Sequence, residues 1–176
     1  MLLLGFAGEV RRSELVALRY EDMTHYDNGL EMLLRWTKTD QEGVGRTVFI
    51  PQVVGKCCPV RALYEWLEIA GKAAGPLFLG GSRHDRTIGT KALTSQTVTP
   101  TLKSYVREMR GVEAASEVSG HSLRAGFVTA AAMAGLQPYQ IREQTGHKSN
   151  ATIARYISAK LINGSSQAYP KSRLFR

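Results

Sequence analysis

The sequence predicts a mainly α fold with a small antiparallel β-sheet, an α+β arrangement, on the basis of three observations. Helix start and stop signals recur along the chain, and only two short segments have the composition of strands. Those two segments flank one polar loop, as the arms of an antiparallel hairpin do. The 176 residues, 43% of them apolar, suffice for one sizeable hydrophobic core. No stretch approaches the ~18–20 continuous apolar residues of a membrane helix.

The N-terminal half predicts two helices and the hairpin. Residues 1–8 are apolar and too short for a signal peptide, so we expect a core helix whose upstream part is missing. Ser13–Leu18 predicts the next helix, because leucines recur three residues apart and Ser13 can cap the N-terminus. A turn at residues 27–29 then precedes the two predicted strands, Leu30–Trp36 and Thr47–Ile50.

The rest of the chain is predicted to be helices joined by loops. Pro59 suits the first residue of a helix that runs to about Ala70, with Gly71 after it as a stop. A short Leu-Phe-Leu run at residues 77–79 leads into a loop that contains glycine and arginine. Further helices are expected over Pro100–Arg110, Ser122–Ala134, Pro138–Gln144 and Ser149–Tyr156.

The formal net charge of +8 lies entirely in the second half of the chain. Residues 1–88 hold 11 basic and 11 acidic residues, whereas residues 89–176 hold 12 basic and 4 acidic residues. A basic half attracts phosphates and releases counterions when it binds nucleic acid. The same excess also suits an ordinary solvated surface, so charge alone indicates a polyanion partner without naming one.

The two cysteines, Cys57 and Cys58, are adjacent and have no partners at the spacing of metal ligands. We therefore expect a reduced, intracellular protein, located in the cytoplasm.

His121 and Arg124 are the first candidates for chemistry, since they lie three residues apart at the start of a predicted helix and share a face. An arginine offers a planar fork of donors to two phosphate oxygens, and a histidine can exchange a proton. The pair therefore suits a phosphate. A capping histidine beside a solvated arginine would give the same pattern.

His147 and Tyr156 are separated by nine residues around a predicted helix start. A histidine beside a helix N-terminus can donate to an anion gathered there, although histidines are also common in loops and caps. Tyr156 alone indicates a half-buried aromatic ring whose hydroxyl has a partner. Each signal is weak by itself.

Two segments of the first half add further candidates. Arg11 could turn inward with Glu14 holding it at i+3, while Arg12 suits the surface. Lys38 lies near the tip of the predicted hairpin, where it is either solvated or carried by a mobile loop into the groove of a substrate.

Together these residues resemble the tyrosine recombinases, the phage integrase family. Five matches occur in the order and approximate spacing of that family: Arg11-x-x-Glu14, Thr37-Lys38-Thr39, His121-x-x-Arg124, Gly146-His147 and Tyr156. Gly120–Phe127 and Thr145–Tyr156 look like its two C-terminal signature boxes. The resemblance covers residues 2–160 and implies the tyrosine recombinase catalytic-domain fold.

The resemblance implies a role for each matched side chain. Tyr156 corresponds to the nucleophile, which forms a covalent 3′-phosphotyrosine intermediate. Arg11 and Arg124 correspond to the clamps on the non-bridging phosphate oxygens, and His147 to a third donor.

Lys38, His121 and Glu14 complete the implied site. Lys38 corresponds to the hairpin lysine that protonates the departing 5′ hydroxyl. His121 matches the histidine that exchanges a proton with the tyrosine, and Glu14 the acidic residue that supports the site. The implied reaction is metal-independent and uses no cofactor.

The resemblance also bears on domain organisation. Arg12 stands where an aliphatic residue is common and Ala125-Gly126 where His-Thr is frequent, but neither change removes a catalytic group. Family members normally carry an upstream helical, core-binding domain, and we expect that domain to be absent from this chain. We therefore expect residues 1–160 to be a catalytic domain, and residues 161–176 a basic C-terminal tail that is either exchanged between protomers or frayed.

We expect a DNA breaking-rejoining enzyme that performs site-specific DNA recombination or DNA integration, as in a mobile element. The implied partners are double-stranded DNA, further copies in a tetramer and accessory DNA-bending proteins, at the nucleoid. A type IB topoisomerase shares the active-site plan, but the two C-terminal boxes favour the integrase branch. A non-catalytic, DNA-binding remnant of an integrase is the alternative of another class.

Overall fold

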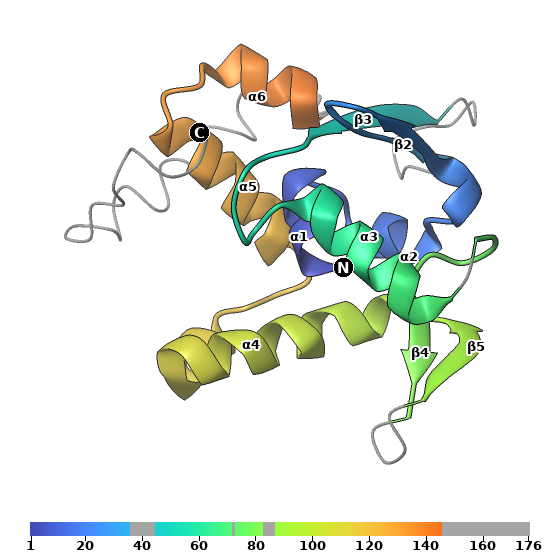
Figure 1. Ribbon diagram of the computed structural model, residues 1–176. Coiled ribbons are helices and arrows are strands. Elements are labelled where there is room, and N and C mark those ends of the chain that lie inside the picture. Colours follow the sequence, from blue (N-terminus) through green and yellow to red (C-terminus); the bar gives the residue numbers. More distant parts are fainter. Residues whose placement is uncertain (36–44, 72, 83–86, 146–176) are drawn as a thin grey trace.

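Figure 1 shows the computed structural model of the chain, which describes residues 1–35, 45–71, 73–82 and 87–145. Within these ranges the helices are α1 (Leu2–Ala7), α2 (Arg12–Ala17), α3 (Pro59–Ala70), α4 (Ser95–Ser116), α5 (Ser122–Met133) and α6 (Pro138–Thr145). The strands are β1 (Met23–Tyr26), β2 (Gly29–Leu34), β3 (Arg46–Pro51), β4 (Leu79–Gly81) and β5 (Ile88–Ala92), and a single 3₁₀ turn covers Tyr20–Asp22. The predicted mainly α fold with antiparallel strands is confirmed.

The larger sheet is antiparallel, in the order β1-β2-β3. β1 and β2 form a tight hairpin in which Tyr26 pairs with Gly29. β2 and β3 pair along their whole length, with Leu34 opposite Arg46 at the end where the chain enters residues 36–44. The predicted hairpin of β2 and β3 is confirmed, and its tip lies outside the described residues.

The prediction of one sheet and a loop after residue 79 was wrong, because β4 and β5 form a second, two-stranded sheet. Its strands have few β-branched or aromatic residues, and a glycine in each strand allows close approach: a Cβ at Gly89 would lie 2.9 Å from the carbonyl oxygen of Gly80. Such strands lack the alternating apolar pattern that identifies a strand in sequence.

The main core lies between the three-stranded sheet and α4 (Figure 1), where α3 packs on α1 and β3 while α2 packs on α4. Its fully buried side chains include Leu4, Leu15, Leu30, Ile50 and Leu63. Helices α1 to α4 and the three strands of the larger sheet all contribute apolar side chains to this core, as expected for a small domain.

α5 joins this core to a second, smaller one. The rings of Phe6 in α1 and Phe127 in α5 meet edge to face, with centroids 6.0 Å apart. Beyond them, Val128 and Ile141 are fully buried and hold α6 against α5. α5 therefore has a fixed position relative to α1, which matters for the site below.

The boundaries of α2 and α4 differ from the prediction. α2 begins at Arg12 with Arg11 as its N-cap residue, so Ser13 is not the cap. α4 begins at Ser95, and Pro100 lies in its second turn instead of opening the helix. α4 also continues past residue 110, through a kink where Gly111 has φ 88° and ψ 177°.

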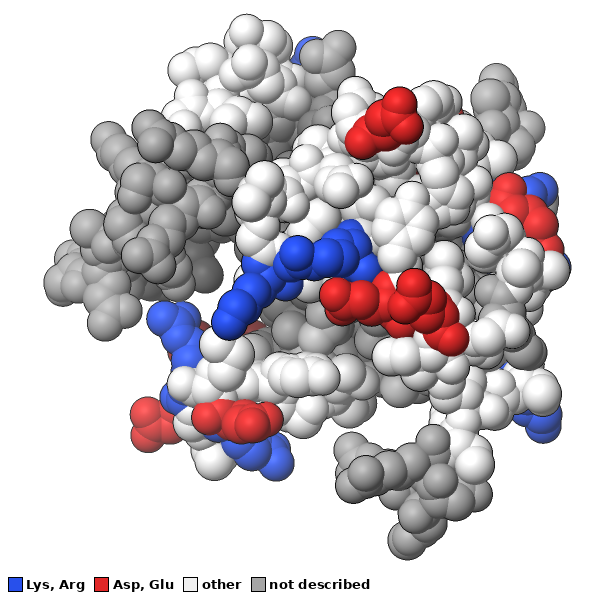
Figure 2. Space-filling model, viewed as in Figure 1, with Lys and Arg blue, Asp and Glu red and all other residues white. Residues whose placement is uncertain are grey.

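Charge on one face of the molecule is mixed. Figure 2 shows Lys and Arg side chains beside Asp and Glu side chains near the centre of this face. Among the described residues on this face, negative side chains interrupt the positive ones. Among the described helices, none combines the length and the apolar character that crossing a membrane requires.

Candidate active site

The site begins at the end of α1, where the chain turns sharply inward. The N–H of Glu9 donates to the carbonyl of Phe6 (3.1 Å), and the N–H of Val10 donates to the carbonyl of Gly5 (3.2 Å). This pair of bonds is the Schellman motif, in which the residue at the position of Glu9 is left-handed and usually glycine. Glu9 accordingly has φ +44°, a conformation that costs a non-glycine residue on the order of 1 kcal/mol.

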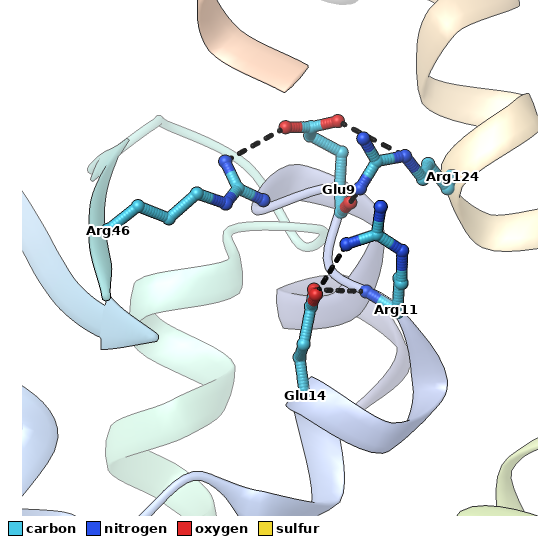
Figure 3. Close-up of polar contacts among 5 residues, drawn as sticks. All are labelled: Glu9, Arg11, Glu14, Arg46 and Arg124. Carbon is cyan, nitrogen blue, oxygen red and sulfur yellow. Dashed lines mark hydrogen bonds and ion pairs between the residues drawn. The ribbon is translucent and has the colours of Figure 1, made fainter. Parts of the chain in front are cut away.

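The turn directs the Glu9 side chain between two guanidinium groups (Figure 3). Glu9 Oε1 lies 3.5 Å from Arg46 Nη1, and Glu9 Oε2 lies 3.9 Å from Arg124 Nε. Arg124 Nη1 also donates to the main-chain carbonyl of Glu9 at 3.3 Å. The α1–α2 turn, the start of β3 and the first turn of α5 thus converge on one fully buried carboxyl group.

Arg124 is buried because it lies on the core-facing side of its helix. Arg124, Val128 and Ala131 follow one another at i, i+4 and i+7, and all three are buried. Burial lowers the pKa of Arg124, and the charge of Glu9 opposes that change. A buried guanidinium needs a counter-charge or hydrogen-bond acceptors close by, and the Glu9 segment supplies acceptors in its main-chain carbonyl and its carboxyl group.

Arg11 is held by Glu14 in the way that its i+3 spacing predicted. Glu14 Oε1 accepts a hydrogen bond from Arg11 Nη1 at 2.7 Å, and Oε2 accepts one from the Arg11 main-chain N–H at 2.8 Å. Glu14 is the third residue of α2, so the second bond also caps that helix. Arg12 is exposed, as predicted, while Arg11 is only partly exposed. Figure 3 shows Arg11 beside Glu9 and Arg124.

The carboxyl group of Glu9 binds its proton tightly. Burial raises the pKa of Glu9 to about 8, although the nearby Arg124 and Arg46 act in the opposite direction. At neutral pH the carboxyl group is therefore mostly protonated. Among the described residues drawn in Figure 3, three guanidiniums, of Arg11, Arg46 and Arg124, then lie near one carboxylate, that of Glu14, so positive charge is in excess. Converging guanidiniums of this kind suit the oxygens of a phosphate.

The other predicted site residues fall into two groups. His121 is the N-cap residue of α5, with an exposed side chain one turn from Arg124, and its main-chain N–H donates to Ser119 Oγ at 3.3 Å. Lys38, His147 and Tyr156 lie outside the described residues.

The base of the hairpin that carries Lys38 is anchored. At the end of β2, Arg35 Nε donates to Asp22 Oδ1, and Asp22 is buried. The same carboxylate accepts the Arg19 main-chain N–H at 2.9 Å. These contacts fix where residues 36–44 leave the sheet. In the described part of the chain, no three His, Cys, Asp or Glu side chains gather as metal ligands would.

Glu9 and Arg46 are site residues that the sequence did not predict. Glu9 is the one charged residue among the first ten, in an otherwise apolar segment, and that contrast was an available signal. Arg46 opens a strand and has no local pattern that separates it from a solvated arginine. Its partner Glu9 is 37 residues away in sequence.

Comparison with known proteins identifies the family. Residues 1–161 match the Phage integrase family. An integrase/recombinase XerD homolog from Selenomonas ruminantium is 39% identical over 160 residues, which are 89% of this chain and 46% of that protein. The tyrosine recombinase XerC of Pelobacter propionicus is 32% identical over 119 residues, which are 65% of this chain and 36% of that protein.

The chain therefore belongs to the phage integrase family, the tyrosine recombinases, as its motifs indicated. It spans less than half the length of either of these two relatives.

Solved structures confirm the fold. The crystal structure of XerA recombinase superposes with a TM-score of 0.59 at 21% identity, covering 95% of this chain and 55% of the other. The XerH site-specific recombinase, bound to its difH substrate in a pre-cleavage complex, also gives a TM-score of 0.59, at 23% identity, covering 94% of this chain and 44% of the other.

The protonated state of Glu9 predicts a pH dependence of stability. Between about pH 4.5 and pH 8 the folded protein holds a proton that the unfolded chain has lost. The free energy of unfolding should therefore fall as pH rises, with Glu9 contributing about 1.4 kcal/mol per pH unit across this window. Urea unfolding of the wild type and of Glu9→Gln at pH 5 to 9 measures this contribution as the difference in slope. Glu113→Gln, at an exposed position of α4, should keep the wild-type slope. Equal slopes for wild type and Glu9→Gln would refute the assignment.

Proposed function

We propose that residues 1–160 are the catalytic domain of a site-specific DNA recombinase that cleaves and rejoins DNA through a covalent 3′-phosphotyrosine. The observation that carries this proposal is the convergence of Arg11 and Arg124, far apart in sequence, on one positively charged site supported by Glu14. Membership of the phage integrase family supports the same reaction.

The arginine cluster suits the chemistry of a phosphodiester. The negative charge of the ester repels nucleophiles, and the crowded transition state gains charge on its equatorial oxygens. Arg11 and Arg124 would bind the non-bridging oxygens, with His147 as a third donor. Groups preorganised in this way stabilise the developing charge, and the loss of one such donor typically costs about 10²–10³ in rate.

Proton transfers complete the proposed reaction. Tyr156 attacks phosphorus, and because a free phenol has a pKa of about 10 it must lose its proton as it attacks. His121 would accept that proton, and Lys38 would protonate the departing 5′ hydroxyl. The phosphotyrosine conserves the energy of the broken bond, so a 5′ hydroxyl from another duplex can reverse the step and exchange strands.

A groove beside the site offers a surface for the DNA backbone. It has a volume of about 490 Å³ between α2 and α4, and its basic side chains are Arg12, Lys103 and Arg107. Arg12 directly follows Arg11, and its side chain lies close to Gly120, where a Cβ would be 3.2 Å away. Arg12 thus connects the groove in sequence to Arg11, and in space to Gly120, which precedes His121. Basic residues along such a path suit successive phosphates.

The proposal extends to partners and location. Recombination joins two duplexes, so the active unit would be a tetramer on DNA, with residues 161–176 as the tail exchanged between protomers. Accessory DNA-bending proteins would assist where the duplex must be bent. The protein would act in the cytoplasm, at the nucleoid.

The nucleophile is tested by Tyr156→Phe, which keeps the aromatic ring and removes its hydroxyl. Incubation with a random-sequence library of nicked duplexes should give an SDS-stable protein–DNA adduct with wild type and none with the variant. DNA affinity, measured at matched salt, should be nearly unchanged. Adduct formation by the Phe variant would remove Tyr156 from the role. Wild type that binds DNA without forming an adduct would support a non-catalytic, DNA-binding function instead.

Metal independence is tested separately. Adduct formation should proceed at the full rate in excess chelator, because guanidinium, imidazole and ammonium groups supply all the charge stabilisation that the proposed mechanism uses. The yield of adduct over time, with and without added Mg²⁺, is the measurement. A strict requirement for a divalent ion would contradict the proposal.

The groove predicts a change in salt dependence. Replacing Lys103 and Arg107 together by alanine should reduce the slope of log affinity against log salt by about 1.8, since each phosphate contact contributes about 0.9. Filter binding between 50 and 300 mM salt measures the slope. Lys56→Ala, outside the groove, is the matched control. An unchanged slope in the double variant would place the DNA elsewhere.

A further inference from the structure

Glu9 has no part in the proposed reaction, yet its carboxyl group lies in the interior of the arginine cluster. The residue is fully buried and adopts a left-handed backbone conformation in which glycine would be unstrained. Within the described residues, Glu9 Oε2 has no hydrogen-bond partner, and its neighbour is Arg124 Nε at 3.9 Å. Burial of the carboxyl group and the left-handed backbone both cost free energy. The end of α1 does not by itself require a glutamate at this position.

The contacts of Glu9 are loose in comparison with those of Glu14. Charge-assisted hydrogen bonds usually measure about 2.7–2.9 Å, and the bond between Arg11 and Glu14 is in this range at 2.7 Å. The two ion pairs of Glu9 measure 3.5 and 3.9 Å. The carboxyl group of Glu9 therefore makes longer contacts with Arg46 and Arg124 than Glu14 makes with Arg11.

We propose that Glu9 is an internal competitor for the anion site: its ionised carboxylate pairs with the guanidinium of Arg124, the group that binds a phosphate oxygen in the proposed reaction. This inference rests on the proposed function, in which Arg124 binds the phosphate. A second anion at the same guanidiniums would lie close to the carboxylate, and two like charges cannot share such a site without cost. The site accepts an external anion most readily when the carboxyl group of Glu9 is protonated.

The charged groups around Glu9 explain how protonation is set. Arg124 of α5 and Arg46 of β3 favour the carboxylate, whereas burial and the carboxylate of Glu14 in α2 favour the protonated acid. Arg11, the N-cap residue of α2, contributes to the positive field at Arg124.

α3, which packs on α1 and β3, carries Arg61, Glu65 and Glu68, but the charged groups that act most on Glu9 are those named above. α1 contains no charged residue, and Arg142 of α6 has an exposed side chain. The balance of these effects raises the pKa of Glu9 to about 8. The change between the protonated and the ionised form of Glu9 therefore falls just above neutral pH.

Sulfate is a suitable probe, because its charge stays constant between pH 6 and pH 10. The midpoint of thermal unfolding, followed against sulfate concentration at constant ionic strength, gives the affinity at pH 7 and at pH 9. For wild type, the affinity should fall about tenfold between these two values, as expected for competition with a group of pKa near 8. For Glu9→Gln the affinity should not change with pH, and at pH 9 it should exceed that of wild type about tenfold.

One further variant of Glu9 and one control variant complete the experiment. Glu9→Gly removes the carboxylate and also relieves the left-handed backbone, so it provides a folded test even if the glutamine variant is unstable. Glu113→Gln, on the exposed side of α4, should behave as wild type. If both Glu9 variants keep the wild-type loss of affinity at pH 9, or bind sulfate more weakly than wild type at both pH values, Glu9 is not a competitor.

Failure of the proposed function would look different. In that case wild type would form no DNA adduct at pH 7, whereas the sulfate measurements would still report on the arginine cluster. If the rate of adduct formation declines above pH 8 in wild type, but not in Glu9→Gln or Glu9→Gly, ionised Glu9 also inhibits DNA cleavage. An identical decline in all three proteins would separate Glu9 from the reaction.

Discussion

The buried guanidinium of Arg124 is the constraint around which the rest of the site is arranged. A permanent positive charge on the core-facing side of α5 must be met by acceptors, since an isolated buried charge is costly. The turn after α1 meets it with a carbonyl and a carboxyl group from Glu9. Arg46 at the start of β3 reaches the same carboxyl group, so helix, turn and sheet are joined through one small polar cluster inside an apolar domain.

The same arrangement of a capping carboxylate bound to a basic side chain occurs twice near this cluster. Glu14 caps its helix through the N–H of Arg11 and uses its other oxygen to hold the Arg11 guanidinium. Asp22 caps a 3₁₀ turn through the N–H of Arg19, and its second oxygen holds Arg35 at the base of the hairpin. In both cases a buried carboxylate caps the N-terminus of a helix or turn and also binds a basic side chain. Rigid support of this kind is what a preorganised site requires.

Local signals account for what the sequence could predict. The bounds of α3 were correct because Pro59 and a left-handed Gly71 mark its two ends. The Arg11–Glu14 contact followed from i+3 spacing. Non-local features were not predictable: β4 and β5 depend on a pairing that their glycine-rich sequences do not signal, and the approach of Arg46 to Glu9 depends on how β3 packs beside α1. Motif order supplied the family, but it could not reveal a carboxyl group placed among the arginines.

The left-handed turn at Glu9 has a consequence for how such a site can change over generations. In the genetic code, glutamate and glycine codons differ by one base, and glycine is the residue that this backbone conformation favours. A single nucleotide substitution would therefore remove both the strain and the buried acid, with no other adjustment of the turn. Loss of the acid is thus a single mutational step.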